Sequence, residues 1–364
     1  MYEILDCKLD KKYCREILDK NNINNILYFP EYSMLWELNG DGIAKMFFYE
    51  CEYGIVLYPF LIRNINNLKF FQQMKITEIF YDITTPYGYG GPLLKSYNKN
   101  NNNLLIEEFT KEFSFFCKEN KIISEFIRFH PLMENHVIFT NRLEIEKMNS
   151  VIYVDLSLTE EELWENYKRN NRKNIKKAMR NNIEVVADEK FEFLDEFLEI
   201  YYKTTKKSNA KKYYFFPKKL FEFIRTSFNN NFVLFISKKN NKIISVELAV
   251  YDKDIIYSFL GGTLSEYFPL RPNNLLKHKL IIWAKEKNIK YYLLGGGYSP
   301  EDGIFKYKHS FSKKGIKDFY VGRKIHNIEK YKLLESEFKK YLLNIYPSID
   351  LKEIKYFPIY RYSI

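Results

Sequence analysis

Glycine residues gather at two places in the second half of the chain. Gly261 and Gly262 end one apolar run, and Gly295, Gly296 and Gly297 end another. Because glycine has no Cβ atom, it allows a backbone to bulge or to approach a ligand closely. Taken singly, each cluster is more typical of an ordinary turn after a strand. Together they favour a place where a ligand meets the backbone.

The segment 298–308 follows the second glycine cluster and combines aromatic residues with lysines. Tyr298 opens it, and Lys306 and Lys308 alternate with aromatic residues near its end. A cation at this position could stabilise a phosphate or the oxyanion of a tetrahedral intermediate. We expect Lys306 to have this role. Lys308 is the weaker candidate, and the alternative for both is a surface lysine without a function.

Three other side chains are candidates for acid–base chemistry. Glu247 lies within the apolar run 243–251, where burial would raise the pKa of its carboxyl group and let it deprotonate an incoming amine. An equal alternative is a solvent-facing residue on a sheet with one buried face. Tyr257 and Asp302 are weaker candidates for the same role.

The densest charge feature is the segment 167–180. Lys168, Arg172 and Lys176 recur every four residues, so on a helix they form one row, which Arg180 extends. Like charges at this spacing destabilise an isolated helix. We therefore expect an anionic partner: phosphates of tRNA, of a nucleotide-linked precursor or of lipid headgroups. The alternative is a solvated basic face.

A second candidate anion site lies at the start of a predicted helix, 273–287. Arg271 precedes Pro272, and Asn273 and Asn274 follow it. The free N–H groups and the dipole of a helix N-terminus suit a phosphate, and an arginine can add a bidentate contact. A proline-capped helix with a surface arginine is the alternative.

Composition bounds the class of protein. The chain has 364 residues, of which 46% are hydrophobic, enough for two domains with real cores. Its formal net charge of +11 makes polyanionic partners plausible. The first ten residues lack a secretion signal, and no apolar run reaches the roughly 20 residues of a membrane span. We expect a cytoplasmic protein with reduced cysteines, and peripheral attachment to the inner membrane face stays open.

Several familiar sites are not expected. The five histidines show no spacing typical of metal ligands, so no metal site is predicted: His130, His136, His278, His309 and His326. GxSxG, GxGxxG and GxxxxGK[ST] are all missing from the sequence, which argues against a serine hydrolase, a Rossmann domain and a P-loop enzyme.

The second half reads as the element order β-α-α-β-β-β-α-β-α-β. Strands are predicted at 185–187, 232–237, 243–251, 255–260, 291–294 and 318–321, and helices at 191–206, 217–228, 273–287 and 303–309. This order resembles the GNAT acyltransferase fold, in which the fourth and fifth strands splay apart and admit an acyl-bearing cofactor arm. Here those two strands end in the two glycine clusters.

The first half is a weaker version of the same order. A hairpin is predicted at 43–50 and 54–62, strands at 78–82 and 125–129, and a helix at 104–118. The fold class is therefore α/β (α+β): tandem GNAT-like acyl-CoA N-acyltransferase domains with mixed, mostly antiparallel sheets flanked by helices. We place a degenerate domain at 1–150, a catalytic domain at 151–330 and a helical or extended tail, packed back on the fold, at 331–364.

Several of these segments resemble the Fem-type aminoacyltransferases, the peptidoglycan bridge-forming branch of the GNAT superfamily, and the related BioF2-like acetyltransferases. The resemblance rests on residues 168–180, 259–263, 271–279, 294–297 and 303–306, with the loop 87–92 in the first domain. It implies an amino group on a cell-envelope precursor as acceptor, and contact between Lys306 and an anionic substrate or the attacked carbonyl. Since no glycine lies between Gly262 and the helix at 273, the usual pyrophosphate site is altered or absent.

The predicted function is transfer of an acyl or aminoacyl group to an amine of a nucleotide- or lipid-linked glycan or peptidoglycan precursor. The resemblance leaves two donor substrates open, acyl-CoA and aminoacyl-tRNA, with no permanently bound cofactor. Acyl transfer from an activated donor needs no protein nucleophile, only orientation, a base and oxyanion stabilisation. The alternative is a non-catalytic protein that reuses the fold to bind RNA or a membrane surface.

Overall fold

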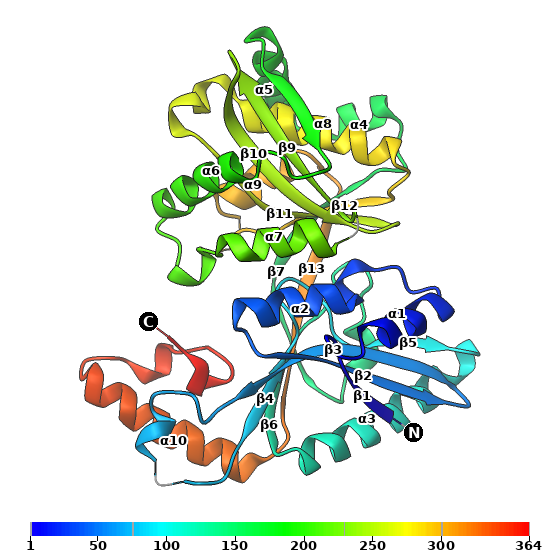
Figure 1. The fold of residues 1–364 in the computed structure, drawn as a ribbon, viewed down its shortest axis with the longest axis vertical. Coiled ribbons are helices and arrows are strands. Elements are labelled where there is room, and N and C mark those ends of the chain that lie inside the picture. Colours follow the sequence, from blue (N-terminus) through cyan, green and yellow to red (C-terminus); the bar gives the residue numbers. More distant parts are fainter. Residues whose placement is uncertain (1, 75, 229, 300, 364) are drawn as a thin grey trace. The chain divides into compact units, whose positions relative to one another are not determined.

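The computed structural model describes residues 2–74, 76–228, 230–299 and 301–363, so Pro300 of the predicted segment 298–308 lies outside the described residues. The chain divides into two units (Figure 1). The first comprises Met1–Ile17, Leu27–Met148 and Phe319–Ile364, and the second comprises Leu18–Ile26 and Asn149–Asp318. Residues 18–26 therefore lie in the second unit and residues 319–330 in the first, unlike in the predicted division at 150 and 330.

The first unit contains a mixed sheet flanked by helices. Its strands run in the order β1 (Tyr2–Asp6), β2 (Ile43–Cys51), β3 (Gly54–Asn64), β4 (Tyr81–Thr84), β6 (Ile122–Arg128) and β13 (Ile316–Ile325), with β5 (Leu93–Ser96) also paired to β3. The helices are α1 (Lys11–Lys20), α2 (Pro30–Asn39), α3 (Asn102–Glu119) and α10 (Ile328–Ile345). The predicted hairpin is confirmed as β2 and β3, and the predicted helix 104–118 as α3.

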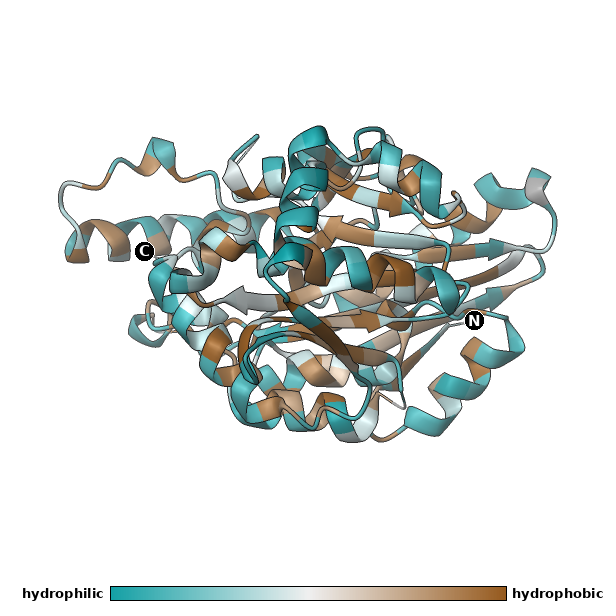
Figure 2. Ribbon diagram, turned by 90° about the horizontal axis from the view of Figure 1, so that it is seen from above, coloured by the Kyte–Doolittle hydropathy of each residue, from teal (hydrophilic) through white to brown (hydrophobic). Residues whose placement is uncertain are grey.

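Aromatic residues form most of the first core. Phe109, Phe113 and Phe116 recur on one face of α3 and are buried against Phe47 and Phe60 of the sheet. This spacing of three and four residues is what an amphipathic helix needs in order to cover a sheet. The helices accordingly show alternating apolar and polar bands (Figure 2). Within the described residues, no helix has the length and apolar character to cross a bilayer.

From β8 (Glu184–Asp188) to α9 (Gly303–His309) the second unit has the element order that the sequence predicts, but the last predicted strand, 318–321, lies in β13 and mostly in the first unit. Its strands run in the order β7 (Glu144–Asp155), β12 (Tyr291–Gly295), β11 (Ile255–Thr263), β10 (Lys242–Tyr251), β9 (Phe232–Lys239) and β8 (Glu184–Asp188). The helices are α4 (Glu160–Asn166), α5 (Arg169–Arg180), α6 (Leu194–Lys207), α7 (Lys218–Ser227), α8 (Pro272–Glu286) and α9 (Gly303–His309). The predicted antiparallel meander 232–260 is confirmed as β9, β10 and β11.

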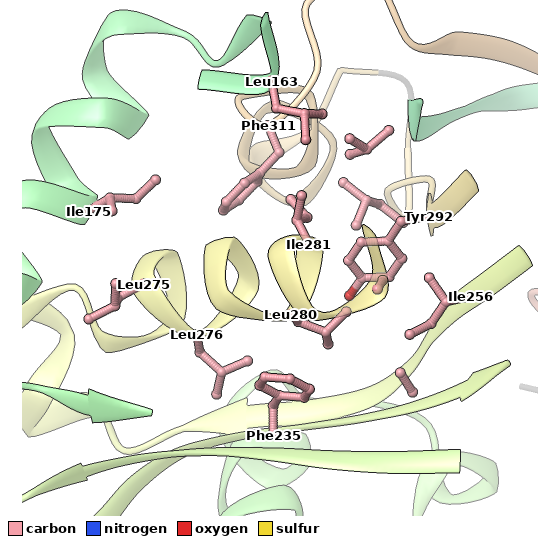
Figure 3. Close-up of a cluster of buried hydrophobic side chains, with 14 of the residues drawn as sticks. Leu163, Ile175, Phe235, Ile256, Leu275, Leu276, Leu280, Ile281, Tyr292 and Phe311 are labelled. Atoms are coloured by element: carbon pink, nitrogen blue, oxygen red, sulfur yellow. The ribbon is translucent and has the colours of Figure 1, made fainter. Parts of the chain in front are cut away.

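Helix α8 is the centre of the second core. Leu276 and Leu280 lie on the side of the helix that faces the strands, near Phe235 of β9, and Ile281 lies on the side near Phe311 (Figure 3). These five side chains are all buried. Helix α8 is covered by strands on one side and by α4, α5 and α9 on the other. A helix buried on two sides is held rigidly, which suits it to position polar side chains.

Candidate active site

Strands β11 and β12 part within the second unit. They pair in parallel through Ile255 and Tyr291, Ile256 and Tyr292, and Tyr257 and Leu293. Beyond this last pair, β11 stays bonded to β10 as far as Thr263, whereas β12 pairs with β7 through Gly295. In the part of the chain that the structure describes, no pairing joins β11 to β12 after Tyr257. The splayed strands expected for a GNAT fold are therefore present.

A buried polar cluster lies where the strands part. The Lys277 ammonium of α8 donates to both Glu247 carboxylate oxygens of β10, at 2.5 and 2.7 Å, and to the Tyr292 hydroxyl of β12 at 3.1 Å. The Tyr292 hydroxyl also donates to Glu247. Ser258, the first β11 residue beyond the paired segment, donates to Glu247 at 2.7 Å. Four elements thus contribute to one hydrogen-bonded group, which we name the Glu247 cluster: Glu247, Ser258, Lys277 and Tyr292.

The charge of Glu247 differs from the expectation. Burial alone raises the pKa of its carboxyl group, but the Lys277 ammonium and the Tyr292 and Ser258 hydroxyls outweigh that effect and hold the pKa below its ordinary value. The expected raised pKa is therefore wrong, and so is the solvent-facing alternative, since the residue is buried. A carboxylate neutralised in this way is a poor proton acceptor and serves better to position its partners.

Lys308 of α9 is the group near this cluster whose charge is easily changed. Its ammonium donates to the carbonyl oxygen of Gly296 at 2.7 Å. Burial, and then repulsion from the Lys277 ammonium, lower the pKa of Lys308 to about 8. Among the described residues, no carboxylate pairs directly with it. Lys308 is thus an amine that can gain or lose a proton near neutral pH.

Lys306 lies two residues before Lys308, which places it about 200° around α9 on the exposed side of the helix. Its side chain is exposed, and its ammonium has no partner within the described ranges. The sequence prediction favoured Lys306 over Lys308, because alternation with aromatic residues does not say which lysine points inward. The helix half-buries Lys308 and leaves Lys306 exposed to a solute.

Asp302 has a structural position. Its carboxylate accepts hydrogen bonds from the backbone N–H groups of Phe305 and Tyr298, each at 2.7 Å, and of Ser299 at 3.2 Å. It therefore caps α9. Although partial burial raises its pKa, these N–H donors lower it below the ordinary value. Tyr298 itself is 71% exposed, so its ring is open to a ligand.

Close contacts and backbone conformation explain why glycine occupies the positions of the two glycine clusters. A Cβ atom on Gly262 would lie 2.4 Å from the Thr204 hydroxyl of α6, and one on Gly261 would lie 2.7 Å from the Val246 carbonyl oxygen. Gly295 has a φ of 76°, in the left-handed region. For Gly296 and Gly297, a Cβ atom would meet the Ser150 carbonyl oxygen and the Asp302 carboxylate, respectively. Close packing explains these glycines without a ligand.

The start of α8 separates into exposed and buried parts. Arg271 is exposed and adopts a left-handed φ of 62° just before the helix. Asn274 is buried and donates to Asn171 of α5 at 2.8 Å, so it joins two helices. The Asn273 carbonyl oxygen accepts a hydrogen bond from the Tyr307 hydroxyl at 3.2 Å. Only Arg271 is placed for contact with a solute anion.

The basic segment forms α5, with Lys168 at its N-cap. The Lys168 ammonium lies 2.9 Å from Nδ1 of His309, and Lys176 lies 5.8 Å from the centre of the Trp164 ring. Within the described residues, no carboxylate pairs with any cation of the basic face of α5, which consists of Arg169, Arg172, Lys173, Lys176, Lys177 and Arg180. Among the described residues the charges of this face are therefore not compensated by carboxylates, as an anion-binding surface requires.

Tyr257 makes a different contact from the one expected. Its hydroxyl accepts a hydrogen bond from the Asn25 side chain at 2.8 Å, and the backbone N–H of Ile26 donates to Asp252 at 3.0 Å. Both donors come from the segment 18–26. Tyr257 is buried and closes the paired part of β11 and β12.

The sequence did not indicate Lys277 or Ser258. A lysine among the apolar residues of α8 was the available signal for Lys277, since a charge at a buried position needs a partner. Among the described residues, no group of three or more His, Cys, Asp or Glu side chains could hold a metal ion. The four cysteines carry free thiols.

Comparison with known proteins agrees with this geometry. Residues 166–309 match the family model described as "Acetyltransferase (GNAT) domain". The structure of FemX matches with a TM-score of 0.63 at 13% identity, over 92% of this chain and 100% of FemX. L-PGS from Bacillus licheniformis matches with a TM-score of 0.53 at 13% identity, over 86% of this chain and 91% of that one.

A third structure has a similar score. The C-terminal domain of a protein assigned as a lysylphosphatidylglycerol synthetase from Agrobacterium fabrum matches with a TM-score of 0.53 at 11% identity, over 93% of this chain and 97% of that one. None of the curated proteins matches the chain significantly in sequence. The predicted resemblance, the tandem GNAT-like fold and the enzyme class, an acyltransferase, are confirmed.

Proposed function

We propose that this GNAT-type acyltransferase moves an acyl or aminoacyl group from acyl-CoA or aminoacyl-tRNA to an amine of a cell-envelope glycan or peptidoglycan precursor. The observation that carries the proposal is the position of Lys308. An amine with a pKa of about 8 lies beside Gly296, directly after the strand that parts from β11. An activated carbonyl in the gap between these strands would be within reach of that amine.

The proposed reaction needs one proton acceptor. The nitrogen of the acceptor amine attacks the carbonyl carbon of the donor, and its proton passes to neutral Lys308. The tetrahedral intermediate then expels the thiolate of CoA or the ribose oxygen of tRNA, which takes that proton back from Lys308 as it leaves, so that Lys308 is again neutral. General-base catalysis of this kind contributes on the order of 10²–10⁴-fold. Orientation of the two substrates between the strands would contribute the rest.

The Glu247 cluster has a positioning role in this proposal. The Lys277 cation favours the neutral form of Lys308, and Glu247 balances the Lys277 charge inside the protein. Lys306 and Arg271, both exposed, are suited to the anionic parts of the substrates. Tyr298 could stack on a sugar or base.

The names of the structural neighbours support a cell-envelope acceptor. FemX bears the name of the Fem type that the sequence resembles, and a lysylphosphatidylglycerol synthetase is named for a lysine-bearing lipid. The basic face of α5 supports a phosphate-bearing substrate such as tRNA, a nucleotide-linked precursor or a lipid headgroup. These features also support the second candidate function, anion binding at RNA or a membrane surface without catalysis.

Purified protein assayed with both donor classes tests the proposal. Acetyl-CoA, longer acyl-CoAs and charged tRNA would each be offered with nucleotide- and lipid-linked precursors that carry a free amine, and product would be measured by mass spectrometry. We expect transfer from one donor class, with a loss of about 10²-fold or more in Lys308→Ala. Lys314→Ala, an exposed lysine in the same unit, is the matched control. Binding of charged tRNA or anionic lipid without any transfer would favour the second candidate.

A further inference from the structure

The first unit contains a cationic cavity that the proposed reaction does not use. The cavity has a volume of about 390 Å³, within the size range of small-molecule sites. It lies between the start of β7 and the end of β13. Its lining is Asn141, Arg142, Leu143, Glu144, Arg323, Lys324, Ile325 and Phe357.

The lining carries three cations and one carboxylate. Arg323 is paired with Glu144 at 3.4 Å and also with Glu146, so its charge is balanced. Lys324 donates only to the neutral hydroxyl of Ser114, at 3.2 Å. The Arg142 guanidinium makes one long contact, 3.4 Å from the carbonyl oxygen of Ile138. Within the described residues, neither Arg142 nor Lys324 meets a carboxylate, so two charges at the cavity are uncompensated.

One donor beside the cavity lacks a partner altogether. The Nε–H group of Arg323 is buried and makes no hydrogen bond with any described residue. A buried unsatisfied donor costs about 1–3 kcal/mol. Native structures contain few such groups, and a bound anion or water is a recognised partner for one.

The cavity also has an apolar side. Phe357, Leu143 and Ile325 form part of its wall, and the Arg323 guanidinium lies 5.9 Å from the centre of the Phe357 ring. A smaller hollow of about 20 Å³ shares Arg142, Leu143 and Lys324 with it. That volume suits a single water molecule or one oxygen-bearing group.

We propose that this cavity is a binding site for a small organic anion. Arg142 and Lys324 would hold a phosphate or carboxylate group, which both accept charge-assisted hydrogen bonds from these side chains. The apolar body of the ligand would lie against Phe357. The site belongs to the first unit and is independent of the acyl-transfer chemistry proposed for the second.

Calorimetry on the full chain tests this site with four probes: phenyl phosphate, benzoate, inorganic phosphate and benzyl alcohol. We expect phenyl phosphate or benzoate to bind with millimolar affinity or better, and more tightly than inorganic phosphate or benzyl alcohol. Whichever of phenyl phosphate and benzoate binds more tightly identifies the anionic group that the site prefers. No saturable binding of either aromatic anion would overturn the proposal, as would equal binding of benzyl alcohol.

Substitutions that change the charge of the lining test whether the anion binds in this cavity, with its affinity as the measured quantity. Arg142→Gln and Lys324→Gln should each weaken binding by about tenfold, the loss of one charge-assisted hydrogen bond. Glu144→Gln should strengthen it, because the only carboxylate of the lining is removed while Glu146 still holds Arg323. Lys332→Gln removes an exposed α10 charge and should leave affinity unchanged. An effect of Lys332→Gln as large as that of Arg142→Gln, or weaker binding in Glu144→Gln, would overturn the site.

Discussion

The Lys277 ammonium lies 2.5 and 2.7 Å from the two carboxylate oxygens of Glu247, and both side chains are buried. A buried ion pair of this kind adds little net stability compared with apolar residues of the same size. Removing one partner, however, leaves the other charge buried without compensation. The pair therefore matters most for what it fixes, which is the charge beside Lys308.

The stability effects of removing Glu247 and of removing Lys277 should be coupled, because each removal leaves the other charge buried without compensation. We expect Glu247→Gln and Lys277→Met each to lower the free energy of unfolding by about 3–5 kcal/mol, and the double variant Glu247→Gln, Lys277→Met to lose less than the sum. Hydrogen exchange of the β10 and β12 amides would measure the free energy of unfolding of the second unit separately from that of the first. Additive effects would mean that the two side chains do not form a coupled pair.

The pH dependence of acyl transfer should report Lys308. Its pKa is lowered to about 8, so its neutral form, the proton acceptor, grows as pH rises through about 8 and levels off only at higher pH. In the wild type, we expect kcat/KM to rise with pH in a step whose midpoint is the pKa of Lys308. In Lys308→Ala, this step should be absent. Lys306→Ala should keep the step while raising KM for the anionic substrate. A rate that falls above pH 8 would instead make Lys308 a cation that stabilises the oxyanion.

Affinity for a polyanion should depend on the basic face of α5. Replacing Arg172, Lys173 and Lys176 by Gln should weaken binding of charged tRNA and lower the slope of log affinity against log salt by about 0.7–0.9 for each lost phosphate contact. Replacing Lys190, Lys219 and Lys253, three exposed lysines of the same unit, provides a control with the same change in net charge. An equal change in slope for both triple variants would mean that tRNA responds to net charge only.

The first unit should lose stability in acid through His130. Burial lowers the pKa of His130 from its ordinary value of 6.5 to about 3, so the folded chain keeps the imidazole neutral while the unfolded chain protonates it. The contribution is therefore fully present above pH 6.5 and is lost as pH falls from 6.5 towards 3. Its slope is at most about 1.4 kcal/mol per pH unit.

A substitution isolates this effect. In His130→Asn, the side-chain oxygen can still accept a hydrogen bond from Leu132 or Met133, which now donate to Nδ1 at 3.2 Å. We expect the variant to be less stable at pH 7 but to depend less on pH between 6 and 4. The β6 amides would be followed by hydrogen exchange, and an unchanged slope would contradict the role of His130.

The regular elements of the second unit were predictable from the sequence because their patterns are local. The alternation and turns of 232–260 sufficed for three strands, and the spacing within 273–287 for α8. Helix α2 shows the limit of this approach. Its buried residues include Pro30, Glu31, Ser33 and Trp36 and surround the helix axis, so they show no apolar stripe with a helical period.

The candidate site was only partly predictable, because its essential contacts join distant elements. Glu247 was identifiable as a carboxylate in an apolar strand, but its pKa depends on Lys277, which is 30 residues away on α8. The choice between Lys306 and Lys308 depends on the rotation of one short helix. Neither the pKa of Glu247 nor the orientation of the two lysines can be predicted from the local pattern of residue types.

The course of the chain between the two units has a consequence for synthesis on the ribosome. The segment Phe319–Ile364 belongs to the first unit, and its residues Val321–Ile325 pair with β6. Everything that builds the second unit is thus translated before the last strand of the first sheet exists. The first unit is therefore the first to be started and the last to be completed during translation. Until β13 has been synthesised, β6 has an unpaired edge to which a strand of another nascent chain could pair.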